Sequence, residues 1–149
     1  MLYLGSDHAG YKVKQLIKKY LDLKKMDYLD LGPAKINLND DYPDYAKKVA
    51  KKIILDNSKK IDSKGILVCG TGLGMSIAAN KLKGIRAVTP YDIKTAKLSR
   101  SHNNSNIIAL RGKGFSINKQ LKILEIWLKT PYTKSSRHER RLKKIDKLK

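Results

Sequence analysis

Short apolar runs alternate with amphipathic helical stripes along this chain, and this alternation constrains the fold more than any other feature. The runs at 2–5 and 65–69 are typical of buried strands. Val13, Leu16 and Ile17 begin a stripe in which apolar residues recur at helical spacing. The other strands are expected at 28–31, 85–88 and 106–110, and the other helices at 43–54, 74–81, 92–100, 117–128 and 136–148.

Repeated strand–helix units predict a three-layer, doubly wound (Rossmann-like) α/β fold. We expect a parallel five-stranded sheet with helices on both faces and a C-terminal helix after it. The length of 149 residues fits a single domain over 1–149. Ligands in such folds bind beyond the carboxyl ends of the strands. The residues that follow 2–5 and 65–69 are therefore the first candidates for a site.

The net charge of +20 is the electrostatic signature of many nucleic-acid-binding proteins. The lysines are nevertheless spread along the whole chain. The sequence has no RNA-binding aromatic signature, no zinc-ligand spacing and no recognition-helix pattern. We therefore expect no specific nucleic-acid partner, and a basic polyanion-binding protein is kept as an alternative from another class.

Cysteine content and hydropathy indicate the cellular compartment of the protein. The one cysteine can form no intrachain disulfide, which favours a reducing compartment. No stretch approaches the roughly 20 apolar residues of a membrane span, and the first residues lack the charged region of a signal peptide. We expect a cytoplasmic protein without a membrane partner.

The stretch ILVCGTGLGMS, 66–76, places Cys69 between an apolar strand and a glycine-rich turn. Gly70, Gly72 and Gly74 allow a tight turn whose N–H groups approach a ligand, and the following helix adds a positive N-terminal field. Such a loop suits phosphate, carboxylate or a developing oxyanion, and its field favours a thiolate. Neither G-x-G-x-x-G nor a P-loop lysine is present. A structural turn with an inert buried cysteine is the alternative.

Two further candidate groups flank other predicted elements. Asp7 and His8 follow the strand 2–5, where they would hold sugar hydroxyls or cap a helix. Thr71 lies in the glycine-rich turn, as a proton shuttle or as an ordinary turn residue. These residues share the ligand-binding edge of the predicted sheet with Cys69.

A second set of candidates does not fall at that edge. His102 and Asn103 precede the strand 106–110 and so lie at its amino end, as site residues that a second subunit would bring to the ligand-binding edge or as an ordinary polar loop. Arg137 and Arg141 share one face of the predicted final helix, near His138. That face is either a bidentate phosphate clamp or a solvated basic surface.

Five stretches carry a family resemblance in order and spacing, and they span nearly the whole chain. They are GSDHAG (5–10), DYPDYA (41–46), GILVCGTGLGMSIAANK (65–81), SHNNSN (101–106) and RHERR (137–141). Together they resemble the B-type ribose-5-phosphate isomerases and their sugar-phosphate isomerase relatives. The third stretch is the most specific.

The resemblance implies aldose–ketose isomerisation of ribose 5-phosphate and ribulose 5-phosphate, in the pentose phosphate pathway, without metal or cofactor. Cys69 matches the general base, 70–74 the pocket for the enediolate oxygen, and Thr71 and His102 the ring-opening pair. The remaining matches are sugar-binding positions (Asp7, His8, Asn103), a pocket wall (Tyr42) and a phosphate clamp (Arg137, Arg141).

The resemblance also implies a homodimer with sites at the interface, so that His102 serves the partner's site. The sequence leaves open whether dimers pair into tetramers, and whether a six-carbon substrate such as allose 6-phosphate is preferred.

One branch of the family has glutamate where Met75 stands and lacks the cysteine, so this chain resembles the cysteine-based branch. Galactose-6-phosphate isomerase subunits lack the Cys-Gly-Thr-Gly pattern. Lys113 replaces a usual arginine, which keeps the charge but not the planar fork.

Overall fold

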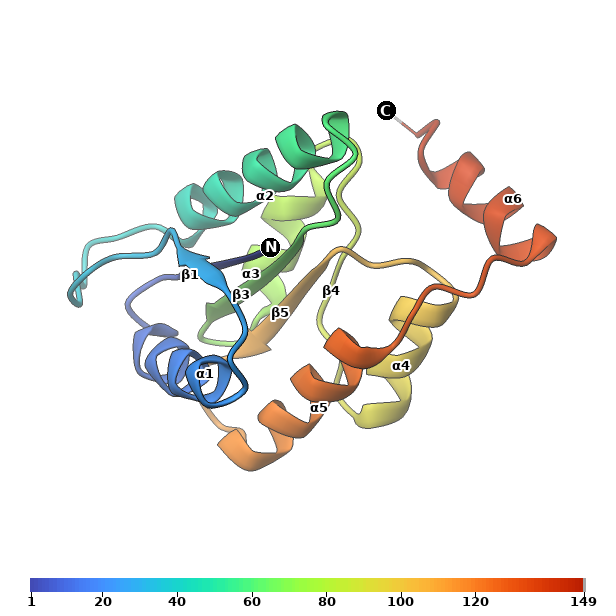
Figure 1. Ribbon diagram of the computed structural model, residues 1–149. Helices are drawn as coiled ribbons and strands as arrows, with labels where there is room; N and C mark the ends of the chain where they lie inside the picture. Colours follow the sequence, from blue (N-terminus) through green and yellow to red (C-terminus); the bar gives the residue numbers. More distant parts are fainter. Residues whose placement is uncertain (149) are drawn as a thin grey trace.

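The computed structural model describes residues 1–148 and has the expected α/β architecture (Figure 1). Its elements, in chain order, are β1 (Leu2–Ser6), α1 (Tyr11–Leu23), β2 (Tyr28–Asp30), α2 (Tyr42–Ser58), β3 (Lys64–Cys69), α3 (Leu73–Asn80), β4 (Ala87–Val88), α4 (Ile93–Ser101), β5 (Ile107–Arg111), α5 (Ile117–Lys129) and α6 (Ser136–Ile145).

The five strands form one parallel sheet in the order β2-β1-β3-β5-β4. The chain therefore runs outward from β1 to β2, returns to place β3 beside β1, reaches the other edge at β4, and turns back to insert β5 between β3 and β4. The predicted strand at 85–88 is shorter than expected, because the Asn106 side chain accepts the Arg86 N–H at 2.8 Å and replaces a ladder bond. Only Ala87 and Val88 pair with β5.

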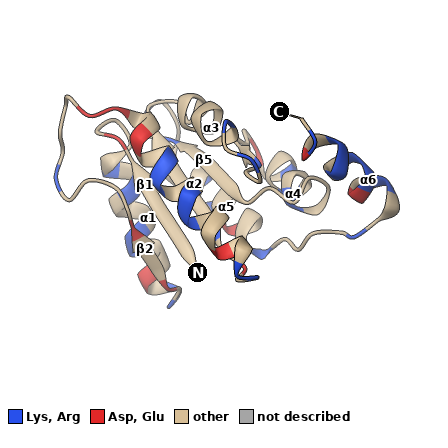
Figure 2. Ribbon diagram, turned by 90° about the horizontal axis from the view of Figure 1, so that it is seen from above, with Lys and Arg blue, Asp and Glu red and all other residues tan. Residues whose placement is uncertain are grey.

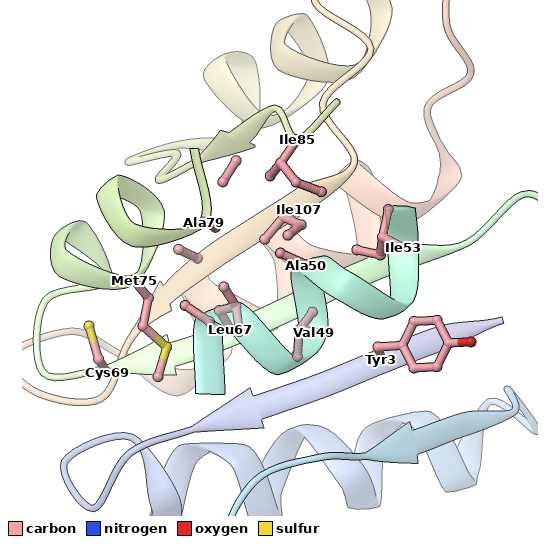
Figure 3. Close-up of a cluster of buried hydrophobic side chains, with 13 residues drawn as sticks. Tyr3, Val49, Ala50, Ile53, Leu67, Cys69, Met75, Ala79, Ile85 and Ile107 are labelled. Carbon is pink, nitrogen blue, oxygen red and sulfur yellow. The ribbon is translucent and has the colours of Figure 1, made fainter. Parts of the chain in front are cut away.

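Helices cover both faces of the sheet, and each face has its own apolar core. Alternate strand residues supply the two cores, as the pleat requires. Tyr3 and Leu67 pack with α2 and α3, in the cluster drawn in Figure 3. Leu4 and Ile66 pack with α1, α4 and α5 on the opposite face. The doubly wound, three-layer prediction is therefore confirmed.

Helix α6 lies beyond α4, outside the three layers, in both ribbon views (Figures 1 and 2). Ser135 caps it by accepting the His138 N–H at 3.4 Å. The buried side chains of α6 are His138 and Leu142. The helix ends at Ile145, three residues before the predicted end at 148. Beyond it, the backbone N–H groups of Lys147 and Leu148 donate to carbonyls three residues earlier, as in a turn, and not four residues earlier, as in an α-helix.

Basic side chains are distributed over several helices, with a dense group on α6 (Figure 2). This distribution agrees with the spread of lysines along the sequence. Across residues 1–148, none of the helices combines the length and the apolar character that crossing a bilayer requires.

Candidate active site

Loops that follow β1, β3 and β5 meet at the carboxyl edge of the sheet, where the strand order reverses. The Asp7 N–H donates to the Val68 carbonyl at 3.3 Å, and the Gly112 N–H donates to the Cys69 carbonyl at 2.7 Å. The Lys113 N–H donates to the carbonyl of the next loop residue, Gly70, at 3.2 Å. In open α/β sheets this reversal point is where ligands bind.

Two glycines allow these loops to approach each other. A Cβ atom on Gly10 would lie 2.1 Å from the Val68 carbonyl oxygen, and one on Gly112 would lie 2.2 Å from the Ala9 carbonyl oxygen. Neither separation is possible for real atoms, so both positions require glycine. The first glycine belongs to the GSDHAG stretch, and the second follows β5.

Cys69 is the last residue of β3, and its side chain is 4% exposed. Its Sγ atom accepts the Gly72 N–H at 3.2 Å. Gly72 has a φ of +79° at the start of α3, a conformation that side chains disfavour. The exposed hydroxyl of Thr71 accepts the Leu73 N–H at 3.3 Å. The thiol therefore lies under a backbone N–H group at the N-terminus of a helix.

The aromatic ring of Tyr42 lies against the glycine-rich loop. A Cβ atom on Gly74 would come within 2.8 Å of that ring, so this glycine makes room for the tyrosine. Met75 is fully buried and lies at the same end of the apolar cluster as Cys69 (Figure 3). Because residue 75 is a methionine, this position supplies no carboxylate that could act as a base.

Asp7 is buried, and its Oδ1 atom accepts the Gly10 N–H at 2.8 Å. Burial raises the pKa of Asp7 above its ordinary value, although the Gly10 hydrogen bond and nearby His8 oppose the rise. The side chain therefore closes the turn that precedes α1, whose N-cap residue, Gly10, has no side-chain cap.

His8 pairs with a residue that the sequence did not single out. Its Nδ1 atom lies 2.6 Å from Asp40 Oδ1, and its backbone N–H donates to the same oxygen at 3.0 Å. Burial raises the pKa of Asp40, but the hydrogen bonds from the His8 backbone N–H and from the His8 ring outweigh burial, so the pKa lies below its ordinary value. Asp40 is therefore ionised at neutral pH.

His102 and Asn103 follow α4 at the amino edge of the sheet, opposite Cys69, as the sequence predicted. The His102 ring stacks on that of His138, with centroids 4.3 Å apart and planes 18° apart. Burial, His102 and the neighbouring arginines of α6 lower the pKa of His138. The guanidinium groups of Arg137 and Arg141 are exposed and form no hydrogen bond to another residue among 1–148.

Within one chain, the predicted site residues thus form two clusters. The first, which we call the carboxyl-edge cluster, contains Asp7, His8, Tyr42, Cys69, Thr71 and the loop glycines 70, 72 and 74. The second, the α4–α6 cluster, contains His102, Asn103, Arg137 and Arg141, with His138. Sequence reasoning missed Asp40, because three aspartates at 40, 41 and 44 look alike in a polar segment.

The chain is thus a doubly wound α/β protein with a buried thiol beneath a helix N-terminus at the reversal point of its sheet, which is an arrangement suited to an anionic ligand. The family model described as ribose/galactose isomerase matches residues 2–145. The chain belongs to this family, which confirms the resemblance and the expectation that it is an isomerase.

Individual relatives agree with this assignment. A probable ribose-5-phosphate isomerase B from Mycoplasma genitalium is 40% identical over 97% of this chain and 92% of that protein. Ribose-5-phosphate isomerase B from Mycobacterium tuberculosis is 36% identical over 95% of this chain and 85% of that protein.

Two crystal structures share the fold over nearly the whole chain. Ribose 5-phosphate isomerase from Thermotoga maritima has a TM-score of 0.90 and 44% identity, covering 99% of this chain and 97% of that chain. The Mycoplasma genitalium ribose-5-phosphate isomerase B with bound ribulose-5-phosphate has a TM-score of 0.89 and 39% identity, covering 97% of this chain and 93% of that one.

Proposed function

We propose that this protein interconverts ribose 5-phosphate and ribulose 5-phosphate through an enediolate, with Cys69 as the general base. The observation that carries the proposal is the Cys69 thiol under the Gly72 N–H at the reversal point of the sheet. The same fold in a Mycoplasma genitalium relative binds ribulose-5-phosphate. We place the activity in the cytoplasm, in pentose phosphate metabolism.

The proton chemistry follows from this geometry. In the open-chain aldose, the Cys69 thiolate removes the proton from C2, and the electron pair moves toward the C1 carbonyl to give an enediolate. Backbone N–H groups of 70–74 stabilise the oxygen at which negative charge develops. The proton is then delivered to C1, and the hydroxyl proton of O2 is transferred to O1, which gives the ketose. No redox cofactor enters this balance.

Substrate preparation and binding are assigned to the other matching residues. Thr71 and His102 open the sugar ring before proton transfer, and Asp7, His8 and Asn103 bind sugar hydroxyls. Tyr42, whose ring lies against Gly74, forms one wall of the pocket. These roles come from the family resemblance, and the placement of Tyr42 beside the glycine loop supports the role given to Tyr42.

Two chains would unite the separated clusters. We infer a homodimer in which the α4–α6 cluster of one subunit completes the carboxyl-edge cluster of the other. An exposed apolar face beside the cysteine loop supports a second copy as its occupant: Leu73 and Ile77, one turn apart on α3, are 55% and 63% exposed. Pairing of dimers into tetramers is not part of this proposal.

The phosphate is assigned to Arg137 and Arg141 of α6. Their guanidinium groups lie four residues apart on one helical face and are not engaged elsewhere within 1–148. Arginine binds phosphate bidentately, so a pair at this spacing suits a phosphate monoester. Lys113, at the carboxyl edge beside Gly70, is available as an additional point charge.

A coupled isomerase assay on ribose 5-phosphate tests the proposal. The wild-type protein should convert ribose 5-phosphate, whereas Cys69→Ala should lose turnover and keep a native circular dichroism spectrum. Because the chain has one cysteine, one thiol adduct, seen by mass spectrometry, should inactivate each subunit, and ribose 5-phosphate should slow its formation.

Three results would contradict parts of the proposal. Turnover of Cys69→Ala near the wild-type rate would exclude Cys69 as the base. Conversion of allose 6-phosphate in preference to ribose 5-phosphate would reassign the substrate to a six-carbon sugar phosphate. Absence of isomerisation together with tight, salt-sensitive binding to polyanions would favour the non-enzymatic alternative.

A further inference from the structure

The carboxylate of Asp40 joins two loops that are far apart in sequence. Asp40 is the penultimate residue of the segment 31–41, which we call the β2–α2 loop, and its Oδ1 atom accepts both N–H groups of His8 at 2.6 and 3.0 Å. The Asp40 side chain is 5% exposed, and the His8 side chain is 33% exposed. The pair is therefore buried on its aspartate side and open to solvent on its histidine side.

This contact determines which nitrogen of His8 carries hydrogen. An ionised carboxylate only accepts hydrogen bonds, so the His8 Nδ1 atom at 2.6 Å must be the protonated one. In the neutral imidazole, Nε2 is then left as an acceptor. Among residues 1–148, no group donates a hydrogen bond to His8 Nε2, and the ring is accessible enough to receive one from a ligand.

The β2–α2 loop is anchored at both of its ends. Near the start of the loop, the Tyr11 hydroxyl donates to the Ala34 carbonyl at 2.9 Å, and Lys14 Nζ donates to the Pro33 carbonyl at 3.1 Å. Lys14 is fully buried. At its other end the loop runs directly into α2. Asp40 therefore lies between the anchored start of the loop and α2, and its own N–H donates to the Asn37 carbonyl at 3.2 Å.

We propose that Asp40 is a positioning residue for substrate binding, which holds His8 in the Nδ1–H form with Nε2 free to accept a hydrogen bond from a sugar hydroxyl. This inference rests on the proposed function, in which His8 binds the sugar. A hydroxyl donates readily to a neutral imidazole nitrogen, and an acceptor fixed in advance costs less ordering free energy on binding.

The first test is the ring tautomer in the substrate-free protein, measured by nitrogen-15 NMR of the three histidines near neutral pH. His8→Asn assigns the His8 signals. The wild-type ring should carry its hydrogen on Nδ1, and Asp40→Ala should move it largely to Nε2. Asp40→Asn should retain the wild-type tautomer, because the amide oxygen still accepts from Nδ1. Asp41→Ala, which removes an exposed neighbouring carboxylate, should change nothing.

The second test is kinetic and uses the same variants. Asp40→Ala should raise KM for ribose 5-phosphate about tenfold, the effect of one lost hydrogen bond to a charged or pre-oriented group, while kcat stays near the wild-type value. Asp40→Asn should recover most of the loss, and Asp41→Ala should behave as wild type.

The two readouts fail separately. An unchanged His8 tautomer in Asp40→Ala would overturn the positioning role, whatever the kinetics. A changed tautomer with unchanged KM would overturn its connection to substrate binding. If the wild-type protein does not isomerise ribose 5-phosphate, the proposed function fails, and the NMR result alone still decides whether Asp40 sets the tautomer.

Discussion

Replacement of Gly72 by alanine tests the local design of the cysteine loop, and Gly84→Ala is its matched control. Both glycines have left-handed backbone angles, with φ values of +79° and +84°. They differ in their surroundings. A Cβ atom on Gly72 would lie 3.1 Å from the carbonyl oxygens of Ala109 and Leu110, whereas one on Gly84 would meet nothing within 4 Å.

The expected magnitudes follow from this difference. Each alanine incurs about 1–2 kcal/mol for the left-handed conformation, offset by about 0.4–1 kcal/mol from the reduced entropy of the unfolded chain. Gly84→Ala should therefore lower the free energy of unfolding by about 0–1.6 kcal/mol. Gly72→Ala also presses on two β5 carbonyl oxygens, at a further cost of about 1–3 kcal/mol.

Urea unfolding measures both variants through Trp127 fluorescence, because this one tryptophan is fully buried and donates to Ser105 Oγ at 2.8 Å. Gly72→Ala should also lose isomerase activity, because relief of the close contacts displaces the backbone of residue 72 and moves its N–H group away from Cys69 Sγ. Gly84→Ala should retain activity. Equal destabilisation of the two variants would refute the argument that close packing on β5 requires glycine at residue 72.

Three further perturbations follow from the contacts described. Asp7→Asn should be more stable than wild type at neutral pH. Burial raises the Asp7 pKa, so ionisation of Asp7 destabilises the folded wild-type protein as the pH rises through that raised value. Urea unfolding should show the difference in stability between the two proteins vanish well below the ordinary pKa of aspartate. Lys14→Met should destabilise the fold by about 1.5–3 kcal/mol, because the Asp30 carboxylate loses Lys14 Nζ at 2.9 Å and keeps Lys18 Nζ at 3.1 Å and the Gly32 N–H at 3.0 Å. Restoration of stability on adding Asp30→Asn would support this cause, and no restoration would contradict it. Arg137→Ala should raise KM for ribose 5-phosphate about tenfold or more, while Lys143→Ala should not; equal effects in steady-state kinetics would indicate diffuse attraction in place of a clamp.

Much of the architecture could be predicted from the sequence because it depends on two local features, the spacing of apolar residues and the positions of polar residues at strand ends. Hydrophobic periodicity indicated the strands and helices, and the parallel sheet placed Asp7 and Cys69 at one edge and His102 at the other. The shortened β4 could not be predicted in this way. It depends on the Asn106 side chain taking the Arg86 N–H, a contact between residues 20 positions apart.

The parts of the site that the sequence did not predict also depend on contacts between residues far apart in the chain. Asp40 differs from Asp41 only in what lies opposite it, and the path of the β2–α2 loop decides that. The stack of His102 on His138 depends on the direction in which the chain leaves α5 and enters α6. Neither direction leaves a periodic pattern in the sequence, so side-chain chemistry alone suggested candidates without their pairing.

The proposed active site is built from two chains, with the carboxyl-edge cluster from one and the α4–α6 cluster from the other. Subunit mixing tests this claim directly. Cys69→Ala and His102→Ala homodimers should each be inactive on ribose 5-phosphate. After subunit exchange, verified by native mass spectrometry of a tagged chain, each mixed dimer should hold one intact site, and activity should return. Absence of recovery in proven mixed dimers would contradict the shared site.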